Sequence, residues 1–583
     1  MRPVALALVF GASASSRLAP RPPKVASALS AAAKVPGAYQ RVKNTYDLST
    51  IERTLATERD ACGVGFVAES AAGPSRRVII AATAACDANE HRGGCSSDCV
   101  SGDGAGIMTQ IPWAVYENDT PALKKRRAEN PDEKLGVATL FVPRDPEAAA
   151  RASELAYEAA SLTGFEVVAW RDLPIDPSIC GEAAAAGRPD FAHVILATAA
   201  DVPERDPRSL ERALYLYRRT LSGLWDREEE FYIASCSHKT VVYKGMVQSS
   251  ALKKFYLDLA NELYVSQFAI YHRRFSTNTM PRWSLAQPFR QIAHNGEINT
   301  IRGNVNWMVS RALAAGADMG AVAAGCSSDD PDRSCEFVDP DQLGPVVDAS
   351  KSDSANLDAS LELYTRAGRT VDESLLLMMP PAIPKPEEKL FFDLHAPLQE
   401  AWDGPAAVCY SDGDVVGARL DRNGLRPARI TRYRDGFVAL SSETGSHKNS
   451  CDAVPPDSEI LERTRLGPGM MCKIDLVKSD GGYYDDAAVK AQVAANPKWA
   501  QELSRQKRTI VDNKPAPAYS YTEDDTRVQA AFGWGSEDVD MQVLAMVAYG
   551  GEATDCMGAD APLAAELNWG DAAYEYIKKR HAK

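Results

Sequence analysis

The sequence predicts an α+β fold in which antiparallel sheets and helices form layers. From about residue 60 onward, short runs rich in β-branched and aromatic residues alternate with segments of helical periodicity. Two Asp-Gly pairs, Asp412-Gly413 and Asp435-Gly436, lie between apolar runs, as expected for tight hairpins. Because hairpins join antiparallel strands, this pattern favours a layered antiparallel domain over a parallel, doubly wound sheet.

The elements expected from this pattern follow one another along most of the chain. The expected strands are Gly63–Ala68, Leu135–Val142, Phe191–Thr198, Phe231–Ser235, Thr240–Tyr243, Gln267–His272, Ala406–Tyr410, Val415–Leu420 and Phe437–Leu440. The expected helices are Val78–Asn89, Pro146–Leu162, Pro207–Leu224, Ala251–Leu263, Asn304–Ala315 and Asn356–Ala367. The acidic stretch Ser327–Asp341 is expected to be an exposed loop, and periodicity is lost at Arg505–Tyr521, which indicates a linker.

Composition excludes several classes of function. A formal net charge of −14 argues against nucleic-acid binding, because phosphate contacts require clustered Lys and Arg. The sequence contains no run of 18 or more apolar residues, so a membrane-spanning helix is not expected. The 12 cysteines are scattered over 583 residues, which fits a reducing compartment better than a disulfide scaffold.

The first 46 residues differ in character from the rest of the chain. They contain no Asp or Glu, and a short apolar core, Val4–Phe10, precedes an Ala-, Ser- and Pro-rich basic tract. This composition is typical of an organelle-targeting segment, with a disordered tail as the alternative interpretation. We therefore expect about the first 45 residues to lie outside the fold.

The stretch Phe268–Met308 carries the densest group of candidate functional residues. An expected strand ends at Arg273 and Arg274, and strand alternation should turn one of them inward, where its guanidinium could hold a carboxylate. A second expected strand ends at Asn295 and Gly296, which could offer a side-chain amide and a backbone N–H to an oxyanion. The alternatives are a surface ion pair for the arginines and a β-turn for Asn295-Gly296.

Two other stretches permit structural as well as functional interpretations. Glu90–Trp113 is glycine-rich but lacks the Gly-Lys-Ser/Thr of a phosphate-binding loop, and Cys95 and Cys99 form only a single C-x₃-C pair, which is weak evidence for zinc. His91 in this stretch is expected to be structural. Asp353 lies between two serines just before an expected helix, where it could cap the helix or point at a cationic substrate group.

Several motifs occur together, in a fixed order, and carry a family resemblance. They are "ACGVGFVAE", "EHRGGCSSDCVSGDGAGIMTQIPW", "FAIYHRRFSTNT", "RWSLAQPFRQIAHNGEINTIRGNVNWM", "SDSANLD", "EAWDGPAAVCYSDG" and "LDRNGLRPAR". Together they resemble the glutaminase region of glutamate synthase, a class II glutamine amidotransferase with an N-terminal nucleophile. "HRGGC", "SDSANLD" and "GSEDV" favour the ferredoxin-dependent type of plastids and cyanobacteria over the pyridine-nucleotide type.

This resemblance implies a fold and a set of site residues. The implied fold is a four-layer αββα sandwich of the N-terminal-nucleophile hydrolase type, whose leader is removed so that Cys62 becomes the first residue. The sulfur of Cys62 is then the nucleophile, and its α-amine, which titrates at about 7.7–8.0, is the general base. Arg274 would bind the substrate α-carboxylate and Asp353 its α-ammonium group, while Asn295 and Gly296 would stabilise the oxyanion. Three more residues are expected to shape the pocket: Thr277, Asn278 and Trp283.

The resemblance also implies a domain organisation and a wider role. We expect a targeting segment and removable leader at 1–61, the glutaminase domain at 62–477, a linker at 478–525 and a truncated start of the glutamate synthase central domain at 526–583. The implied reaction is hydrolysis of L-glutamine to glutamate and ammonia. The ammonia would be assimilated with 2-oxoglutarate in a synthase half that this chain lacks. FMN, an iron–sulfur cluster and ferredoxin as electron donor belong to that half, so no cofactor is expected here, and the expected location is the plastid stroma.

Other readings of the motifs remain open at this point. The chain could be another amidotransferase of the same class with a different ammonia acceptor, although the ordered motifs argue against it. It could also be a non-catalytic glutamine-binding fragment, or a partner subunit of a separate synthase polypeptide. The state of the N-terminus separates these readings, because without a free amine at Cys62 there is no internal base.

Overall fold

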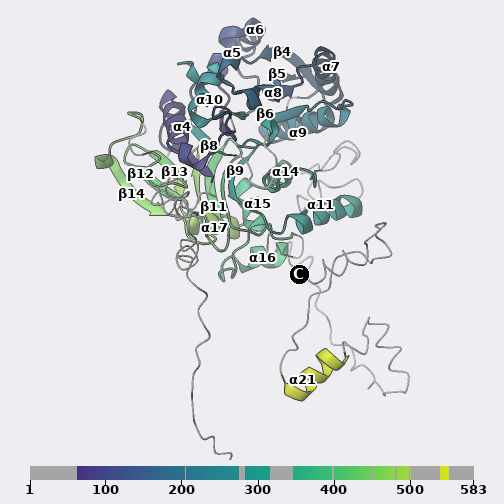
Figure 1. Cartoon of the computed structure of the whole chain (residues 1–583), viewed down its shortest axis with the longest axis vertical. Coiled ribbons are helices and arrows are strands. Elements are labelled where there is room, and N and C mark those ends of the chain that lie inside the picture. Colours follow the sequence, from purple (N-terminus) through teal and green to yellow (C-terminus); the bar gives the residue numbers. More distant parts are fainter. Residues whose placement is uncertain are drawn as a thin grey trace, which may run out of the picture. The chain divides into compact units, whose positions relative to one another are not determined.

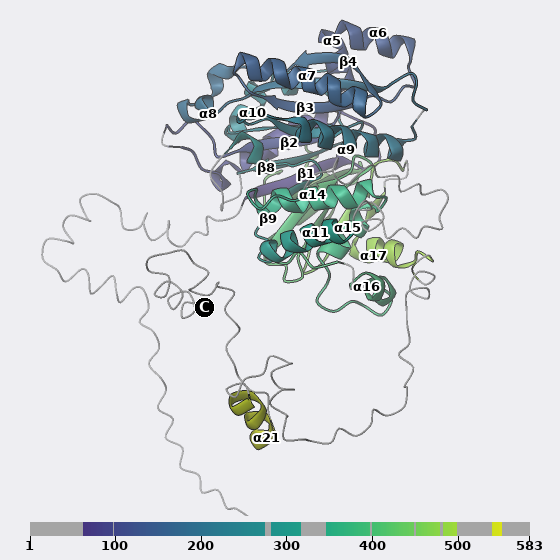
Figure 2. The same ribbon diagram turned by 90° about the vertical axis from the view of Figure 1, so that its right-hand side faces the viewer.

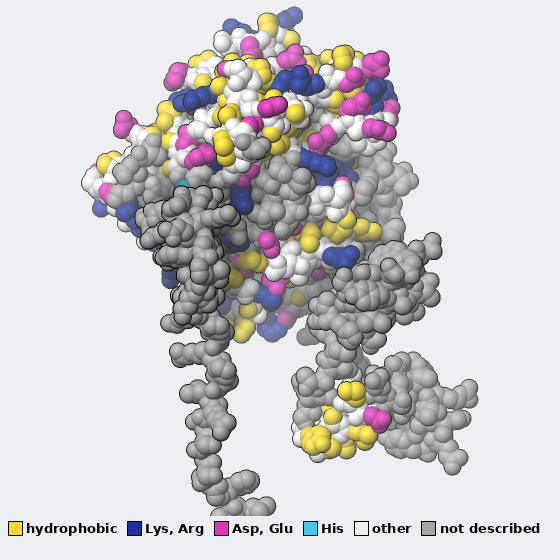
Figure 3. Space-filling model, in the orientation of Figure 1, with side chains coloured by type: hydrophobic (Ala, Val, Ile, Leu, Met, Phe, Trp, Pro, Cys, Tyr) yellow, Lys and Arg dark blue, Asp and Glu magenta, His cyan; other side chains and the backbone are white. Residues whose placement is uncertain are grey.

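The computed structural model describes residues 62–499, except 97, 204, 275–281, 316–345, 397–398, 448–450, 479–481 and 498, and residues 539–550. The expected leader, the acidic stretch Ser327–Asp341 and the expected linker Arg505–Tyr521 lie outside these described residues. The chain divides into two units, Met1–Gln506 and Lys507–Lys583. In the second unit, helix α21 (Leu544–Tyr549) exposes apolar side chains such as Val547 and Tyr549 (Figure 3).

A seven-stranded antiparallel sheet forms the first half of the core of the large unit. Its order is β14 (Ile460–Arg465), β12 (Arg429–Tyr433), β13 (Phe437–Ser441), β1 (Gly63–Glu69), β8 (Phe268–Arg273), β2 (Ala105–Gln110) and β7 (Thr240–Gly245). The hairpin predicted at Asp435-Gly436 joins β12 to β13. Strand β1, which directly follows Cys62, therefore lies in the middle of this sheet.

A five-stranded antiparallel sheet packs against the seven-stranded one. Its order is β16 (Tyr483–Tyr484), β15 (Met471–Asp475), β11 (Val415–Leu420), β10 (Ala406–Ser411) and β9 (Ile292–Gly296). The hairpin predicted at Asp412-Gly413 joins β10 to β11. Alternate side chains of both sheets, such as Phe66 and Ile270 from one and Val416 and Ile474 from the other, form a shared core.

Helices cover the outer faces of the two sheets (Figures 1 and 2). Helices α4 (Arg76–Ala88) and α10 (Ser249–Phe255) contribute to the core on the outer side of the seven-stranded sheet. Helices α14 (Asp353–Arg366) and α15 (Val371–Met378) pack with Val408 and Tyr410 of the five-stranded sheet. The four layers are thus helix, sheet, sheet and helix, and the predicted αββα sandwich is confirmed.

A third sheet, not expected from the sequence, adds a subdomain to this sandwich. Its strands run in the order β4 (Phe165–Asp172), β5 (Asp190–Thr198), β3 (Gly136–Val142) and β6 (Tyr232–Ser237). Helices α7 (Pro146–Leu162) and α9 (Pro207–Leu224) share a hydrophobic core with it and have the limits predicted from the sequence. Positive and negative side chains are interspersed on the visible surface of this upper region in Figure 3 rather than segregated.

Shorter elements complete the described part of the chain. The remaining α-helices are α5 (Trp113–Asp119), α6 (Pro121–Glu129), α8 (Glu182–Ala186), α11 (Ile301–Ala315), α16 (Lys389–His395) and α17 (Asp486–Ala494). Short 3₁₀ segments lie at Glu90–Arg92, Pro177–Ile179, Leu257–Ala260, Trp283–Leu285 and Asp457–Glu459, and a π-helical turn at Val539–Val543 precedes α21. None of the described helices has the length and apolar character that crossing a membrane requires.

The single helix predicted over Ala251–Leu263 was wrong. The structure divides it into α10 and the 3₁₀ helix Leu257–Ala260, because Tyr256 between them has an extended backbone. The Tyr256 hydroxyl donates a hydrogen bond to the Lys244 carbonyl at 2.8 Å, and its backbone bridges to Ile175. Tertiary contacts at one aromatic residue therefore outweigh the local helical periodicity.

Candidate active site

Cys62 is held between the two sheets by hydrogen bonds to its own backbone. It is only 7% exposed and directly precedes β1. The backbone N–H of Cys62 donates to Asn295 Oδ1 at 3.2 Å, and Asn295 Nδ2 donates to the Cys62 carbonyl at 3.0 Å. The Ser442 hydroxyl also lies 3.3 Å from that carbonyl and accepts the Val64 N–H at 3.1 Å. Asn295 on β9 and Ser442 after β13 thus fix the nucleophile candidate from both sheets.

Arg273 is the inward-facing member of the arginine pair, and its guanidinium is occupied by groups of this chain. It is 1% exposed, donates to a Glu90 carboxylate oxygen at 2.7 Å and forms an ion pair with Asp103. It also donates to the carbonyls of Gly94 at 3.2 Å and Gly104 at 3.0 Å. The guanidinium group of Arg273 therefore holds together the glycine-rich loop between α4 and β2.

Arg274 departs from the strand geometry of its neighbour. Its φ angle is 91°, an uncommon value for a residue with a Cβ, so the backbone leaves the strand here. Its N–H donates to the Gly104 carbonyl at 2.8 Å, and its Nε lies 3.7 Å from an Asp103 carboxylate oxygen. The side chain of Arg274 keeps 22% exposure, unlike the buried Arg273, and lies near the thiol of Cys62.

Charged groups of both signs act on the Cys62 thiol. Burial raises the pKa of the thiol to about 11, the guanidinium groups of Arg274 and Arg426 lower this pKa, and the carboxylates of Asp103 and Asp353 raise it. At neutral pH the thiol is therefore protonated, and a base is needed to generate the nucleophilic thiolate. The same four groups place cations and anions together around one sulfur atom.

Asp353 is the first residue of α14, and Ser352, not Asp353, caps that helix. The Ser352 hydroxyl accepts the Ala355 N–H at 3.2 Å. The Asp353 carboxylate accepts the N–H of Ile298 at 2.9 Å and that of Ser354 at 2.6 Å. Asp353 therefore joins the start of α14 to the segment that follows β9, and so to Asn295 and Gly296.

Gly296 occupies a position that only glycine fits. Its φ angle is 132°, and a Cβ placed there would lie 1.8 Å from the Pro405 carbonyl oxygen. This close approach of the two backbones lets β9 end beside the start of β10 directly after Asn295.

Of the three residues expected to shape the pocket, Trp283 lies within the described part of the chain. Trp283 is 2% exposed, donates from Nε1 to the Ala184 carbonyl at 3.0 Å, and packs against the rings of Phe191 and Phe255 in the core over the seven-stranded sheet. Thr277 and Asn278 lie outside the described residues.

Sequence reasoning did not single out Asp103, Arg426 or Ser442. Asp103 lies between the two arginines, Arg426 acts on the Cys62 thiol, and Ser442 contacts the Cys62 carbonyl. Their only signal was a place in the stretches "SGDGAG", "LDRNGLRPAR" and "SSETG". A polar residue within such a stretch is a candidate, but its partner comes from a distant part of the chain.

No described group of three or more His, Cys, Asp or Glu side chains is arranged to hold a metal ion. Cys95 and Cys99 are exposed and free, and His91 lies on the surface with Nδ1 3.2 Å from the Ala88 carbonyl. The described residues therefore do not fit an iron–sulfur cluster, which needs several cysteine ligands together.

Comparison with known families decides the classification. The family model of class II glutamine amidotransferases matches residues 62–501, which include the whole described core. The chain belongs to the class II glutamine amidotransferases. A second model, for the glutamate synthase central domain, matches residues 527–583 of this amidotransferase.

Curated relatives of this class II amidotransferase include ferredoxin-dependent glutamate synthases. Ferredoxin-dependent glutamate synthase 2, chloroplastic, of Arabidopsis thaliana is 41% identical over 91% of this chain and 31% of its own length. The chloroplastic enzyme of Oryza sativa subsp. japonica is 40% identical over 91% and 32%, and glutamate synthase 2 of Synechocystis sp. is 39% identical over 91% and 33%. The chain spans about a third of the length of these relatives.

A solved structure of the allosteric regulatory enzyme of purine biosynthesis shares 14% identity with the chain, at a TM-score of 0.25. The match covers 60% of this chain and 48% of that one, and we draw no argument from so low a score.

Proposed function

We propose that this chain is the glutaminase part of a glutamate synthase and hydrolyses L-glutamine to glutamate and ammonia through a Cys62 γ-glutamyl thioester. The arrangement around Cys62 carries the proposal. Cys62 is buried and directly precedes a central strand, and the side chain of Asn295 forms hydrogen bonds to the backbone N–H and carbonyl of Cys62. Arg274 and Asp353 act on the Cys62 sulfur with opposite charges. Such a pair of charges suits a substrate that bears both a carboxylate and an ammonium group.

The proposed base is the α-amine of Cys62, which exists only after the bond between Ala61 and Cys62 is cleaved. A thiol with a pKa of about 11 gives little thiolate at pH 7. A free α-amine titrates at about 7.7–8.0 and can take the thiol proton, whereas an amide nitrogen cannot. The sulfur then attacks the side-chain amide carbon, the proton passes to the leaving nitrogen, and ammonia departs. Water finally cleaves the thioester to release glutamate and restore the thiol.

The roles proposed for the other residues follow from their chemistry. Arg274 binds the α-carboxylate of glutamine and Asp353 its α-ammonium group. The oxyanion is stabilised by the side-chain amide of Asn295 and the backbone N–H of Gly296. Asn295 Nδ2 carries two hydrogens, so it can hold the Cys62 carbonyl with one and donate the other to the oxyanion. Thr277, Asn278 and Trp283 shape the substrate pocket.

The wider proposal concerns what receives the ammonia. We infer from the relatives that a synthase half combines it with 2-oxoglutarate, with reduced ferredoxin as electron donor. FMN and an iron–sulfur cluster would belong to that half and take no part in glutamine hydrolysis. The chloroplastic relatives and the basic, acid-free first 46 residues support a plastid location.

Two measurements test the glutaminase proposal. Intact-mass and N-terminal analysis of the mature chain should find Cys62 as the first residue, and glutamine should yield equimolar glutamate and ammonia. Cys62→Ala should abolish this hydrolysis, while Cys180→Ala, a change at a partly buried cysteine outside the site, should retain it. Hydrolysis by Cys62→Ala would refute the nucleophile. A mature chain that keeps residues before Cys62 and binds glutamine without turnover would instead favour the non-catalytic glutamine-binding reading.

A further inference from the structure

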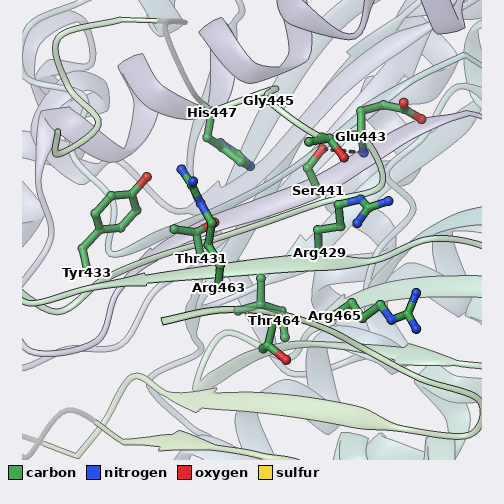
Figure 4. A pocket seen from close by; sticks show the side chains of 12 residues that line it. Arg429, Thr431, Tyr433, Ser441, Glu443, Gly445, His447, Arg463, Thr464 and Arg465 are labelled. Carbon is green, nitrogen blue, oxygen red and sulfur yellow. Dashed lines mark hydrogen bonds between the residues drawn. The ribbon is translucent and has the colours of Figure 1, made fainter. Parts of the chain in front are cut away.

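A hollow of about 500 Å³ lies at the edge of the seven-stranded sheet. It is lined by β12, β14 and the segment that follows β13 (Figure 4). Strand alternation places Arg429, Thr431 and Tyr433 on the outer face of β12, because Ile430 between them points into the core shared by the two sheets. The volume falls in the range of small-molecule sites, about 300–1,000 Å³.

Two arginines are paired directly across the strands in this hollow. Arg429 of β12 lies opposite Arg465 of β14 in the antiparallel register. Residues paired in this way have Cβ atoms about 4.5–5.5 Å apart, and like charges so close destabilise the strand pair. Within the described part of the chain, neither guanidinium has a hydrogen-bond or ion-pair partner. Both side chains are exposed, so two like charges lie close together with N–H donors that face solvent.

The other charges of the hollow are largely balanced by neighbours. Arg463, two residues before Arg465 on β14, forms an ion pair with Asp457 at 3.0 Å. Glu443 is engaged by Arg92, whose Nε lies 2.9 Å from a Glu443 carboxylate oxygen. The uncompensated charge in the hollow is therefore that of Arg429 and Arg465, and it is positive.

The hollow also offers neutral donors and apolar surface. Thr431 lies opposite Arg463, so its hydroxyl stands beside a guanidinium group. Ser441 lies opposite Arg429, but its buried hydroxyl already donates to the Ser446 hydroxyl at 3.1 Å. Figure 4 shows Arg463 and His447 approaching each other from opposite walls, with Tyr433 at one end. Arg429 and Ser441 lie together toward the other end of the view. Guanidinium groups at one end, with an aromatic ring at the other, suit a ligand with an anionic head and an organic body.

We propose that this hollow binds a phosphorylated metabolite of nucleotide size, with its phosphate groups on Arg429 and Arg465. Phosphate oxygens accept the parallel N–H donors of guanidinium groups bidentately, and two phosphates joined by a bridging oxygen can engage two adjacent forks. The ligand neutralises the repulsion between the two arginines, so its binding stabilises the β12–β14 pair.

This site is separate from the substrate site but shares a wall with it. Ser441 faces the hollow. The hydroxyl of the next residue, Ser442, donates a hydrogen bond to the Cys62 carbonyl on the other side of the sheet. The proposed occupant is not the glutaminase substrate, and the inference does not depend on Cys62 being the nucleophile.

The alternative to ligand binding is a purely structural role for Arg429 and Arg465. β14 is an edge strand, and charged side chains on edge strands discourage pairing with other chains. Such a role requires no ligand, and lysine or arginine at either position would serve it. A phosphate site instead requires both guanidinium forks at once.

The experiment uses the full chain and three probes: inorganic pyrophosphate, ADP and citrate. Calorimetric titration measures the affinity at low salt and at about 0.15 M salt. The two salt concentrations are compared because an affinity that depends on ion pairs with an exposed anion falls as salt rises. The double variant R429Q/R465Q tests the site, and Arg432→Gln is the matched control. Arg432 lies on the same strand but pairs with Glu462 and stacks over Tyr483 on the opposite face.

We expect pyrophosphate and ADP to bind with comparable or, for ADP, higher affinity, and to raise the thermal midpoint of unfolding. R429Q/R465Q should weaken both affinities at least about tenfold, since a hydrogen bond to a charged group contributes about 1.5–3 kcal/mol, and Arg432→Gln should not. Equal affinity in R429Q/R465Q, no binding of pyrophosphate or ADP up to about ten millimolar, or tighter binding of citrate than of pyrophosphate would each overturn the proposal. A midpoint no lower than that of the unmodified chain, with an unchanged glutaminase rate, would show that the unliganded double variant is folded; relief of the repulsion between Arg429 and Arg465 should raise the midpoint slightly.

Discussion

Asn295 brackets the backbone of Cys62, accepting its N–H at 3.2 Å and donating to its carbonyl at 3.0 Å. One amide side chain on the five-stranded sheet thus positions the residue that precedes the central strand of the other sheet. Once Cys62 carries a free amine, the same Oδ1 would orient that amine. The proposed nucleophile, its proposed base and the proposed oxyanion donor therefore share one set of contacts.

Asn295→Asp should lower kcat far more than it changes KM. The variant keeps the size of the side chain but replaces the Nδ2 donor with a carboxylate oxygen, which repels the developing oxyanion. Loss of one such donor costs about 10²–10³ in rate. Steady-state glutamine hydrolysis measures both constants, and circular dichroism checks the fold. A raised KM with an unchanged kcat would assign Asn295 to substrate binding instead.

The two adjacent arginines should respond differently to the same substitution. Arg274→Met should leave the thermal midpoint nearly unchanged and raise KM for glutamine, because it removes the proposed carboxylate contact from a partly exposed side chain. Arg273→Met should unfold at a lower temperature, since it leaves Glu90 and Asp103 without their buried partner. Breaking a fully buried pair costs about 3–5 kcal/mol, and the cost here should be smaller, because the Glu90 side chain is 41% exposed and Arg274 stays near Asp103. Equal loss of stability in both variants would contradict this division of roles.

The layered fold could be predicted because it rests on local patterns. Helices α7 and α9 have the limits expected from their periodicity, and both Asp-Gly hairpins formed. The strands that were missed include β2, β4, β14, β15 and β16. β2 lies in a glycine-rich stretch, and β14, "ILERTR", is an exposed edge strand with little apolar alternation. Their strand state comes from pairing with neighbours distant in the sequence, which a local pattern does not record.

In the candidate site, too, the local sequence pattern predicts some features, and others depend on distant parts of the chain. Arg273 and Arg274 look alike in the sequence, and strand alternation indicates only that one of them is buried. Which of the two guanidinium groups is paired with carboxylates of this chain depends on the positions of Glu90 and Asp103, and on the φ angle of 91° at Arg274. Arg426 reaches the neighbourhood of Cys62 from a segment more than 300 residues away, which no spacing rule indicates.

Gly296→Ala should destabilise the fold and lower activity together. The new Cβ would lie 1.8 Å from the Pro405 carbonyl, so the backbone that carries the proposed oxyanion donor must move. Gly303→Ala is the matched control, because it lies within α11 with no atom within 4 Å of a new Cβ. The control should gain about 0.4–1 kcal/mol of stability and keep its activity. Thermal unfolding and glutamine hydrolysis test both; an active, stable Gly296→Ala would remove Gly296 from the site.

His272 should make the protein less stable as pH falls below 6.5. Its side chain points into the core between the sheets, with Nε2 3.0 Å from the His294 carbonyl, and burial lowers its pKa to about 3. Because the folded pKa lies below the unfolded value of about 6.5, its contribution is complete above pH 6.5 and is lost between 6.5 and 3, by about 1.4 kcal/mol per pH unit. His272→Gln removes this titration, so the stability difference between it and the unmodified protein should shrink by about 2 kcal/mol from pH 7.5 to pH 5. Urea unfolding at both pH values measures the difference, with exposed His91→Gln as control; a pH-independent difference would show that His272 is not held neutral by burial.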